Sequence, residues 1–379
     1  MLDLTADQRE FAKAARGFAD RELADHAVEW DQQKFLPVDV LRRAAEMGMG
    51  GLYVSEDVGG SGLSRLEAAL IIEGLATGCP SIASFVSIHN MTAWMIDRYG
   101  DEEQRASYLP DLCSMEHFGS YCLTEPGAGS DAAALTTKAV LDGEDYVLDG
   151  VKQFISGAGT SQVYVVMART PDDGPKSISA FIVEKGTPGL SFGPNEIKMG
   201  WNAQPTRQVV FEQVRVPRSA LLGGAGNGFK IAMSGLNGGR VNIAASSLGG
   251  ATAALERTLK YMADREAFGQ SLDSFQALRF QLADMATELE AARLLLWKAA
   301  ASIDAKDPKV ATWCAMAKRF VTDVSFEVAN RALQLHGGYG YLAEYGIEKI
   351  VRDLRVHQIL EGTNEIMRVI ISRSLVGSA

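Results

Sequence analysis

The N-terminal part of the chain carries a helical pattern of apolar positions. Over residues 4–30, apolar residues recur at intervals of three and four, and Thr5 with Gln8 has the spacing of a capping box. The same periodicity predicts further helices, bounded by Gly-rich or Pro-containing breaks, at residues 41–49, 64–77, 82–99 and 102–109. The chain up to about residue 120 is therefore predicted to be helical.

The pattern changes between residues 121 and 217. Short runs rich in Val, Ile, Phe and Tyr predict strands at residues 146–148, 163–168, 178–183 and 209–211. The dipeptides Asp142-Gly143 and Asp149-Gly150 are hairpin signals. Because no long helical pattern separates these runs, we expect an antiparallel barrel or sandwich and exclude a doubly wound parallel sheet.

Helical periodicity returns after the glycine-rich residues 223–228 and lasts to the end of the chain. The predicted helices cover residues 229–264, 275–304, 307–335 and 364–375. Long Ala- and Leu-rich segments with short breaks are typical of an antiparallel four-helix bundle. The expected fold class is thus α+β and multidomain, with a helical domain (1–120), a β domain (121–225) and a helical bundle (226–379).

Composition narrows the possible functions. The chain has 379 residues, 47% of them hydrophobic and 22% charged, which fits a globular protein with a core. Its net charge of −10 argues against a nucleic-acid partner, since such binding needs a basic face. We expect no membrane span, because the apolar runs are shorter than ~18 residues, and a cytoplasmic location in the absence of a targeting peptide, or the mitochondrial matrix only if a transit peptide has been removed. Neither the histidines nor the cysteines have metal-ligand spacing, so no metal is expected.

Three segments carry candidate chemistry. The glycine-rich loop 121–131 has bare backbone N–H groups that could surround a phosphate or a flat heterocycle, although a purely structural turn is an equal alternative. Residues 337–341 read as a helix C-cap. Glu361 precedes Gly362 at the mouth of a helix, which fits either a surface helix start or a ligand site.

Four segments, taken together, favour a ligand site over the purely structural alternatives. Residues 121–131, 154–157, 334–340 and 360–365 resemble the signature segments of the acyl-CoA dehydrogenase family, in order and over essentially the whole chain. The resemblance implies FAD-dependent α,β-dehydrogenation of an acyl-CoA, electron transfer to electron-transfer flavoprotein, and a homotetramer. Other stretches, among them residues 87–91 and 235–240, resemble members that oxidise isobutyryl-CoA in valine breakdown.

Several alternatives to isobutyryl-CoA oxidation stay open. The substrate could be another short acyl-CoA, such as butyryl-CoA or 2-methylbutyryl-CoA. An acyl-CoA oxidase would use oxygen as acceptor, but such enzymes are commonly longer. A flavin-binding module without dehydrogenation would have no need of Glu361.

By resemblance, Glu361 is the base that removes the substrate α-proton. Some family members carry this base on an earlier helix, directly before an arginine, and here that position is Gly239 before Arg240. In this family the thioester oxygen is held by the ribityl 2′-hydroxyl and by the N–H of the base itself. The substrate-binding residues implied are Ser130, Asn237, Arg240, Gly362 and Arg373. Asn237 stands where relatives often have Asp, and Arg373 could equally be a charge at a helix C-terminus.

The resemblance divides the FAD contacts into two groups. In the first, Leu123 lies against the flavin ring, Thr124 bonds its pyrimidine edge, and Phe154 replaces a Trp common in relatives. This first group comprises Tyr121, Leu123, Thr124, Gly129, Ser130, Phe154, Ile155, Ser156, Thr363, Asn364 and Glu365. The second group holds the pyrophosphate and adenosine from a neighbouring subunit and comprises Arg265, Phe268, Phe275, Gln276, Gln334, Gly337 and Gly338.

Overall fold

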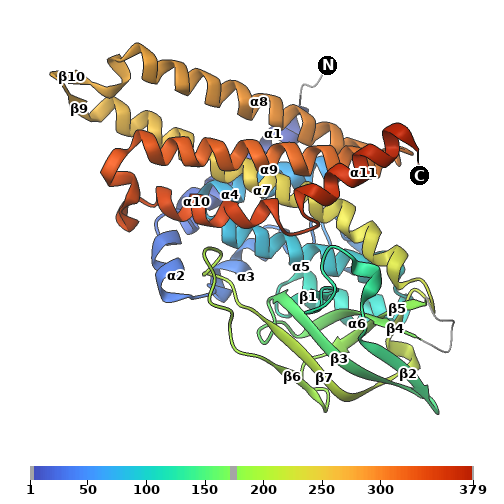
Figure 1. Ribbon diagram of the computed structural model, residues 1–379. Coiled ribbons are helices and arrows are strands. Elements are labelled where there is room, and N and C mark those ends of the chain that lie inside the picture. Colours follow the sequence, from blue (N-terminus) through green and yellow to red (C-terminus); the bar gives the residue numbers. More distant parts are fainter. Residues whose placement is uncertain (1–3, 171–176, 378–379) are drawn as a thin grey trace.

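The computed structural model describes residues 4–170 and 177–377 (Figure 1). Its N-terminal part is helical, as expected. The helices are α1 (Ala6–Glu22), α2 (Ala27–Gln33), α3 (Val38–Glu46), α4 (Arg65–Gly78), α5 (Pro80–Tyr99) and α6 (Glu102–Cys113). Capping boxes start α1 at Thr5, α4 at Ser64 and α6 at Asp101.

The single helix expected over residues 4–30 is wrong, because the chain breaks after α1. The Ala24 N–H bonds to the carbonyl of Ala19, five residues back, in place of the next i to i−4 bond, and the helix ends there. The chain then changes direction into α2, where Trp30 is buried in the same core as Phe18. The break therefore allows both aromatic side chains to be buried, and the local periodicity does not show it.

The middle part forms one sheet. Its strands are β1 (Gly119–Cys122), β2 (Lys138–Asp142), β3 (Asp145–Ser156), β4 (Val163–Arg169), β5 (Ile178–Glu184), β6 (Leu190–Phe192), β7 (Thr206–Pro217) and β8 (Leu221–Leu222). The order is β6-β7-β3-β2-β4-β5-β8, with β1 beside β4. Most neighbours are antiparallel, as expected, but β4 pairs in parallel with β1 and with the first residue of β2.

One hairpin signal is confirmed and the other is wrong. Asp142 pairs with Asp145 across a two-residue turn in which Gly143 has φ +68°. Gly150, in contrast, lies inside β3, where the register against β7 shifts between Leu148 and Gly150. Its φ is +149°, and a Cβ there would lie 2.5 Å from Thr137 Oγ1. This glycine therefore permits a bulge and a close approach, not a chain reversal.

The C-terminal part consists of helices around the central α7. These are α7 (Gly228–Asp264), α8 (Gln276–Asp304), α9 (Val310–Leu335), α10 (Ile347–Arg355) and α11 (Asn364–Val376). Helix α7 packs against α4, α5, α8 and α9, and α11 packs on α9. A hairpin of β9 (Glu266–Ala267) and β10 (Gln270–Ser271) joins α7 to α8. Of these elements, α10 and the hairpin were not predicted.

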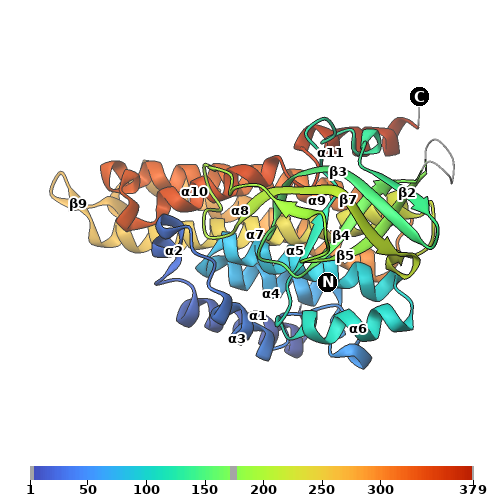
Figure 2. The same ribbon diagram turned by 90° about the horizontal axis from the view of Figure 1, so that it is seen from below.

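The arrangement separates two ends of the molecule. Both views show the β9–β10 hairpin at one end, beyond the long helices, and strand β2 at the other (Figures 1 and 2). Helix α11 runs above the middle sheet in Figure 2. None of the helices in the described residues combines the length and apolarity needed to cross a bilayer.

Candidate active site

A cavity of about 1060 Å³ lies where the middle sheet meets α7 and the start of α11. Its walls include Tyr121 on β1, Phe154 on β3, Arg240 on α7 and Glu361 in the turn before α11. The other sequence-predicted residues that line it are Leu123, Thr124, Gly129, Ser130, Ile155, Ser156, Gly362, Thr363 and Arg373. The fold thus brings together residues from three separate parts of the chain.

Glu361 lies in a strained turn and faces the bare backbone of α7. Its φ is +56°, in the left-handed region, and Gly362 follows with φ +90°. A Cβ on Gly239 would lie 2.5 Å from Glu361 Oε2, so any larger residue there would displace the carboxylate. Arg240 Nε donates to the Glu361 carbonyl at 3.2 Å, which ties the turn to α7.

Glu361 is half-buried, and its carboxylate oxygen Oε2 is inaccessible to solvent. Its Oε2 has no hydrogen-bond partner among the described residues. Burial raises the pKa of Glu361 to about 7, against the lowering effect of Arg240 and Lys318. A carboxyl that titrates near neutral pH is well matched to accepting a proton from a weak carbon acid.

The sheet side of the cavity is held by a buried ion pair that the sequence reasoning missed. Lys152 Nζ donates to Glu125 Oε1 at 2.8 Å and to the Leu123 carbonyl at 3.1 Å. Glu125 also accepts hydrogen bonds from the backbone N–H groups of Thr136 and Thr137. Burial opposes ionisation of Glu125, but its hydrogen bonds prevail and lower its pKa to about 2. The pair fixes the loop that carries Leu123 and Thr124.

A second residue that the sequence reasoning missed, Lys318, bonds the segment that follows Glu361. Lys318 on α9 is fully buried and donates to the Gly362 carbonyl at 2.8 Å and to Asn364 Oδ1 at 2.9 Å. It shares a helix face with the buried residues Cys314, Val321 and Ser325. A lysine within an otherwise uncharged buried stripe is the signal that could have drawn attention to it.

A third missed feature links the middle sheet to the turn before Glu361. Trp201, which lines the cavity, donates its indole N–H to His357 Nε2 at 3.0 Å. His357 Nδ1 therefore carries the ring proton and donates to Ser247 Oγ at 2.6 Å. Burial lowers the pKa of His357 to about 3, so the ring stays neutral and the chain of hydrogen bonds is fixed.

The cavity fits a flat aromatic cofactor. Phe154 is 64% exposed, with φ +58°, on a strand whose next residue, Ile155, is buried. The hydroxyl of Tyr121 is buried and has no partner in the described part of the chain. Added Cβ atoms at Gly127 and Gly129 would meet nothing within 4 Å, so this loop has room for a ligand along its backbone. An exposed aromatic face, an unpaired hydroxyl and open backbone are what the flavin of FAD requires.

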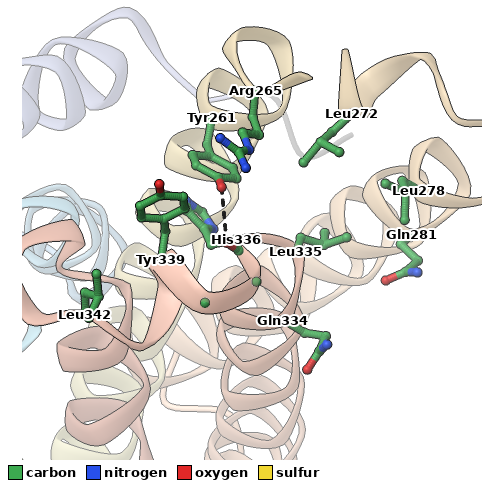
Figure 3. Close-up of a pocket in the computed structure, with 12 residues that line it drawn as sticks. Tyr261, Arg265, Leu272, Leu278, Gln281, Gln334, Leu335, His336, Tyr339 and Leu342 are labelled. Carbon is green, nitrogen blue, oxygen red and sulfur yellow. Dashed lines mark hydrogen bonds between the residues drawn. The ribbon is translucent and has the colours of Figure 1, made fainter. Parts of the chain in front are cut away.

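A second pocket, of about 670 Å³, lies near the other end of α7 (Figure 3). Arg265, Gln334, Gly337 and Gly338 line it, as part of the second group of predicted FAD contacts. The Tyr261 ring stacks on His336 at 4.4 Å and its hydroxyl donates to the His336 carbonyl. The Arg265 guanidinium lies 5.4 Å from the centre of the Tyr339 ring, so a cation and aromatic faces border one concave surface.

The two pockets lie at different positions along α7. Arg240 and Arg265 are both on or next to α7, and 25 helical residues span about 37 Å. Of the remaining predicted contacts, Phe268 is 96% exposed at the hairpin and packs edge-on against Phe275. Neither residue lines the second pocket, nor does Gln276 at the start of α8.

Three other predicted residues do not line the first cavity. Asn237 accepts a hydrogen bond from Arg240 Nη1 at 3.0 Å, so its contact is with the arginine. Asn364 is buried against Lys318 and donates to Asp323 at 2.7 Å. Glu365 is exposed and pairs with Arg368 in the first turn of α11. In the described ranges no group of three or more His, Cys, Asp or Glu side chains is arranged to hold a metal ion.

Comparison with known proteins identifies the class. Residues 5–116, 120–214 and 226–376 match the family models for the N-terminal, middle and C-terminal domains of acyl-CoA dehydrogenase. The chain therefore belongs to the acyl-CoA dehydrogenase family, whose members are FAD-dependent oxidoreductases. The family, fold class and cofactor implied by the sequence are thereby confirmed.

Individual relatives narrow the comparison. The chain is 54% identical over 375 residues to "Isobutyryl-CoA dehydrogenase, mitochondrial" of Bos taurus, covering 99% of this chain and 90% of the relative. It is 56% identical, with the same coverage, to the protein of that name in Dictyostelium discoideum. Among solved structures, a chain from "Electron transferring flavoprotein of Acidaminococcus fermentans: Towards a mechanism of flavin-based electron bifurcation" superposes with TM-score 0.97 at 41% identity, over 100% of both chains.

Proposed function

We propose that the protein oxidises isobutyryl-CoA to methacrylyl-CoA, as in valine catabolism, with Glu361 as the catalytic base. The observation that carries this proposal is the Glu361 carboxylate, buried in the cavity, unpartnered at Oε2 and facing Gly239. The identity to isobutyryl-CoA dehydrogenases supports the choice of acyl chain.

The residues of the chain supply proton removal and its setting. Glu361 takes the α-proton of the thioester, and the apolar walls exclude water, which keeps the carboxylate basic. The Glu361 N–H donates to no backbone carbonyl in the described residues, so it is free to stabilise the negative charge that develops on the thioester oxygen. FAD, when bound, supplies the acceptor for the hydride that leaves the β-carbon.

FAD is held at two places in this proposal. Residues around Tyr121, Phe154 and Ser156 hold the flavin, while Arg265 and Gly337 of a neighbouring subunit hold the pyrophosphate and adenosine. The separation of the two pockets along α7 supports this division. A protein that shares its cofactor in this way is at least a dimer, and we propose the dimer of dimers of this family.

The proposed electron acceptor is supported by a structural relative, and the proposed compartment by the thiols. We propose electron-transfer flavoprotein as acceptor, supported by the structural similarity to a chain from a structure of that flavoprotein. The four cysteines are buried and free. They support a reducing compartment, and we propose the cytoplasm, with the mitochondrial matrix, named for two relatives, as the alternative if a transit peptide has been removed.

A substrate panel tests the function. Initial rates are measured with isobutyryl-, butyryl-, 2-methylbutyryl- and isovaleryl-CoA and an artificial electron acceptor, in air and under nitrogen. The expected kcat/KM is at least tenfold higher for isobutyryl-CoA, a preference of about 1.4 kcal/mol. A higher kcat/KM with butyryl-CoA, the straight-chain substrate, would overturn the proposed acyl chain but not the proposed type of reaction. Turnover that needs only oxygen would indicate an oxidase, and no turnover would indicate a binding module.

The shared cofactor is tested with Arg265→Ala. FAD retention after gel filtration should fall while the circular dichroism spectrum stays the same, since the proposed contact is with the pyrophosphate. Arg218→Ala, at an exposed position after β7, is the control. Unchanged FAD affinity would remove Arg265 from the site, and a monomer by sedimentation would contradict the sharing.

A further inference from the structure

Lys318 is a buried lysine to which neither the family resemblance nor the proposed reaction gives a role. It lies in the middle of α9, and its side chain is fully buried. A lysine ammonium seldom occupies such a position unless it is paired or hydrogen-bonded, because desolvation of the charge is costly. Its contacts therefore indicate what it does.

Those contacts converge on the segment that carries Glu361. Lys318 Nζ donates to the carbonyl of Gly362, the next residue, at 2.8 Å and to Asn364 Oδ1 at 2.9 Å. The Asn364 amide in turn donates to Thr322 Oγ1 at 3.0 Å and to Asp323 Oδ1 at 2.7 Å. One ammonium thus fastens both the turn and the first residue of α11 to helix α9.

The turn needs such an anchor. Glu361 and Gly362 have consecutive positive φ values of +56° and +90°, and a non-glycine residue holds this conformation only when its surroundings impose it. Arg240 holds the Glu361 carbonyl from the α7 side, and Lys318 holds the Gly362 carbonyl from the α9 side. The two cations fix successive peptide groups on either side of the carboxylate-bearing residue.

We propose that Lys318 is a positioning residue for Glu361: its ammonium clamps the Gly362 carbonyl and, as the charge behind the base, keeps Glu361 ionisable inside an apolar cavity. The inference rests on the proposed role of Glu361 as base. It assigns to α9 a part in the reaction that the cavity-lining residues do not reveal.

The charged and titratable surroundings favour this arrangement. Glu361 is influenced by Arg240 from α7 and by Lys318 from α9, and both lower its pKa against the raising effect of burial. Tyr121 from β1 is also close, but burial keeps its pKa well above 10. Arg240 on α7 lowers the pKa of Lys318, whereas Asp323 on α9 and Glu365 on α11 raise it. Burial lowers the pKa of Lys318 to about 7, and Glu361 opposes that shift. Each of the two groups therefore supports the charged form of the other.

Three variants separate the clamp from the charge. Lys318→Met removes both, Lys318→Gln keeps a donor for the Gly362 carbonyl without the charge, and Lys309→Met removes an exposed lysine just before α9 as a control. In each FAD-loaded variant the protonated-carboxyl infrared band of Glu361 is titrated, after assignment by its loss in Glu361→Gln. The pH dependence of kcat and KM for isobutyryl-CoA is measured alongside.

The expected result is a pKa of Glu361 raised by about one unit in both Lys318 variants, since an opposite charge close by has been removed. The acid limb of kcat/KM should move to higher pH by the same amount. At a pH where Glu361 is ionised, kcat should fall about tenfold or more in Lys318→Met, with KM changed less than threefold. Lys318→Gln should recover most of that kcat but keep the shifted pKa. Lys309→Met should match the wild type.

An unchanged Glu361 titration in both Lys318 variants would overturn the proposal, whatever happens to the rate, and would leave Lys318 a purely structural lysine. If Lys318→Met does not fold, the Glu361 titration in Lys318→Gln alone tests the proposal. Failure of the proposed function has a different signature. Glu361→Gln would keep its turnover, while the infrared titration would still show whether Lys318 governs the carboxyl.

Discussion

Two glutamates in this molecule, each close to a buried lysine, have opposite properties. Glu125 in the middle sheet bonds Lys152 at 2.8 Å and accepts further hydrogen bonds from Thr136 and Thr137, and its pKa is lowered to about 2. Glu361 has no partner at Oε2, and its pKa is raised to about 7. Its lysine bonds the neighbouring peptide carbonyl and not the carboxylate.

The difference shows what separates a structural carboxylate from a reactive one. Both side chains lose hydration on burial, which disfavours the charged form. At Glu125 direct hydrogen bonds to the carboxylate outweigh that loss, so the group is locked in its ionised form. At Glu361 the nearby cations act through the backbone and at a distance. The carboxylate therefore keeps a free lone pair, and its pKa lies near neutral pH.

Glu361→Gln tests the reactive member of the comparison and has the largest expected effect. Turnover of isobutyryl-CoA should fall by about 10³-fold or more, since glutamine cannot accept the α-proton and a general base supplies roughly 10²–10⁴-fold. FAD content and acyl-CoA binding should be retained. Above pH 7 the free energy of unfolding should not decrease, because an unpaired buried charge has been removed. A variant with more than a tenth of wild-type kcat would show that another group is the base.

Glu125→Gln tests the structural member. The change leaves the Lys152 ammonium buried without its carboxylate, so the free energy of unfolding in urea should fall by about 3–5 kcal/mol. Adding Lys152→Met should restore most of that loss, because the buried charge is then gone as well. A loss below about 1 kcal/mol in the single variant would mean that the pair does not stabilise the sheet.

Gly239→Ala tests the space that keeps Glu361 unpartnered. The new Cβ would lie 2.5 Å from Glu361 Oε2, so the carboxylate must move, and a displacement of ~1 Å lowers kcat by about 10²-fold. Combining it with Glu361→Asp, whose carboxylate is withdrawn by one methylene, should give less than the product of the two single losses. Additive losses would show that residue 239 acts on something other than the carboxylate.

The pH dependence of the wild type is the prediction with the smallest expected effect, and it separates the behaviour of Glu361 from that of Glu125. Below about pH 7, kcat/KM should fall tenfold per unit as Glu361 becomes protonated in the free enzyme. Glu125 has a lowered pKa, so its contribution to stability is complete above pH 4.5 and is lost only as the pH falls toward 2. Rates and circular dichroism from pH 5 to 9 should therefore show reversible loss of activity in a folded protein. Parallel loss of both signals would contradict the separation.

Local signals in the sequence predicted much of the fold. The capping boxes at Thr5 and Ser64 and the turn at Gly143 depend on residues within a few positions, and all three are present. Helix α10 was missed because its buried face includes Lys349 and Asp353, which neutralise each other at 2.6 Å. In a hydrophobicity pattern the two charged residues of a buried ion pair look like exposed residues, because the pattern does not show that they are paired.

For the candidate site, the sequence determined which groups exist, and the tertiary structure decided what they can do. The order of the motifs, the glycine before Arg240 and the carboxylate at Glu361 are all visible in the chain. Their meeting is not, because Arg240 and Glu361 are 121 residues apart and belong to different elements. The raised pKa of Glu361, the clamp from Lys318 and the separation of the two pockets all depend on burial and distance. These quantities arise only when α7, α9 and the middle sheet pack together, because desolvation and Coulomb energy are set by neighbours in space.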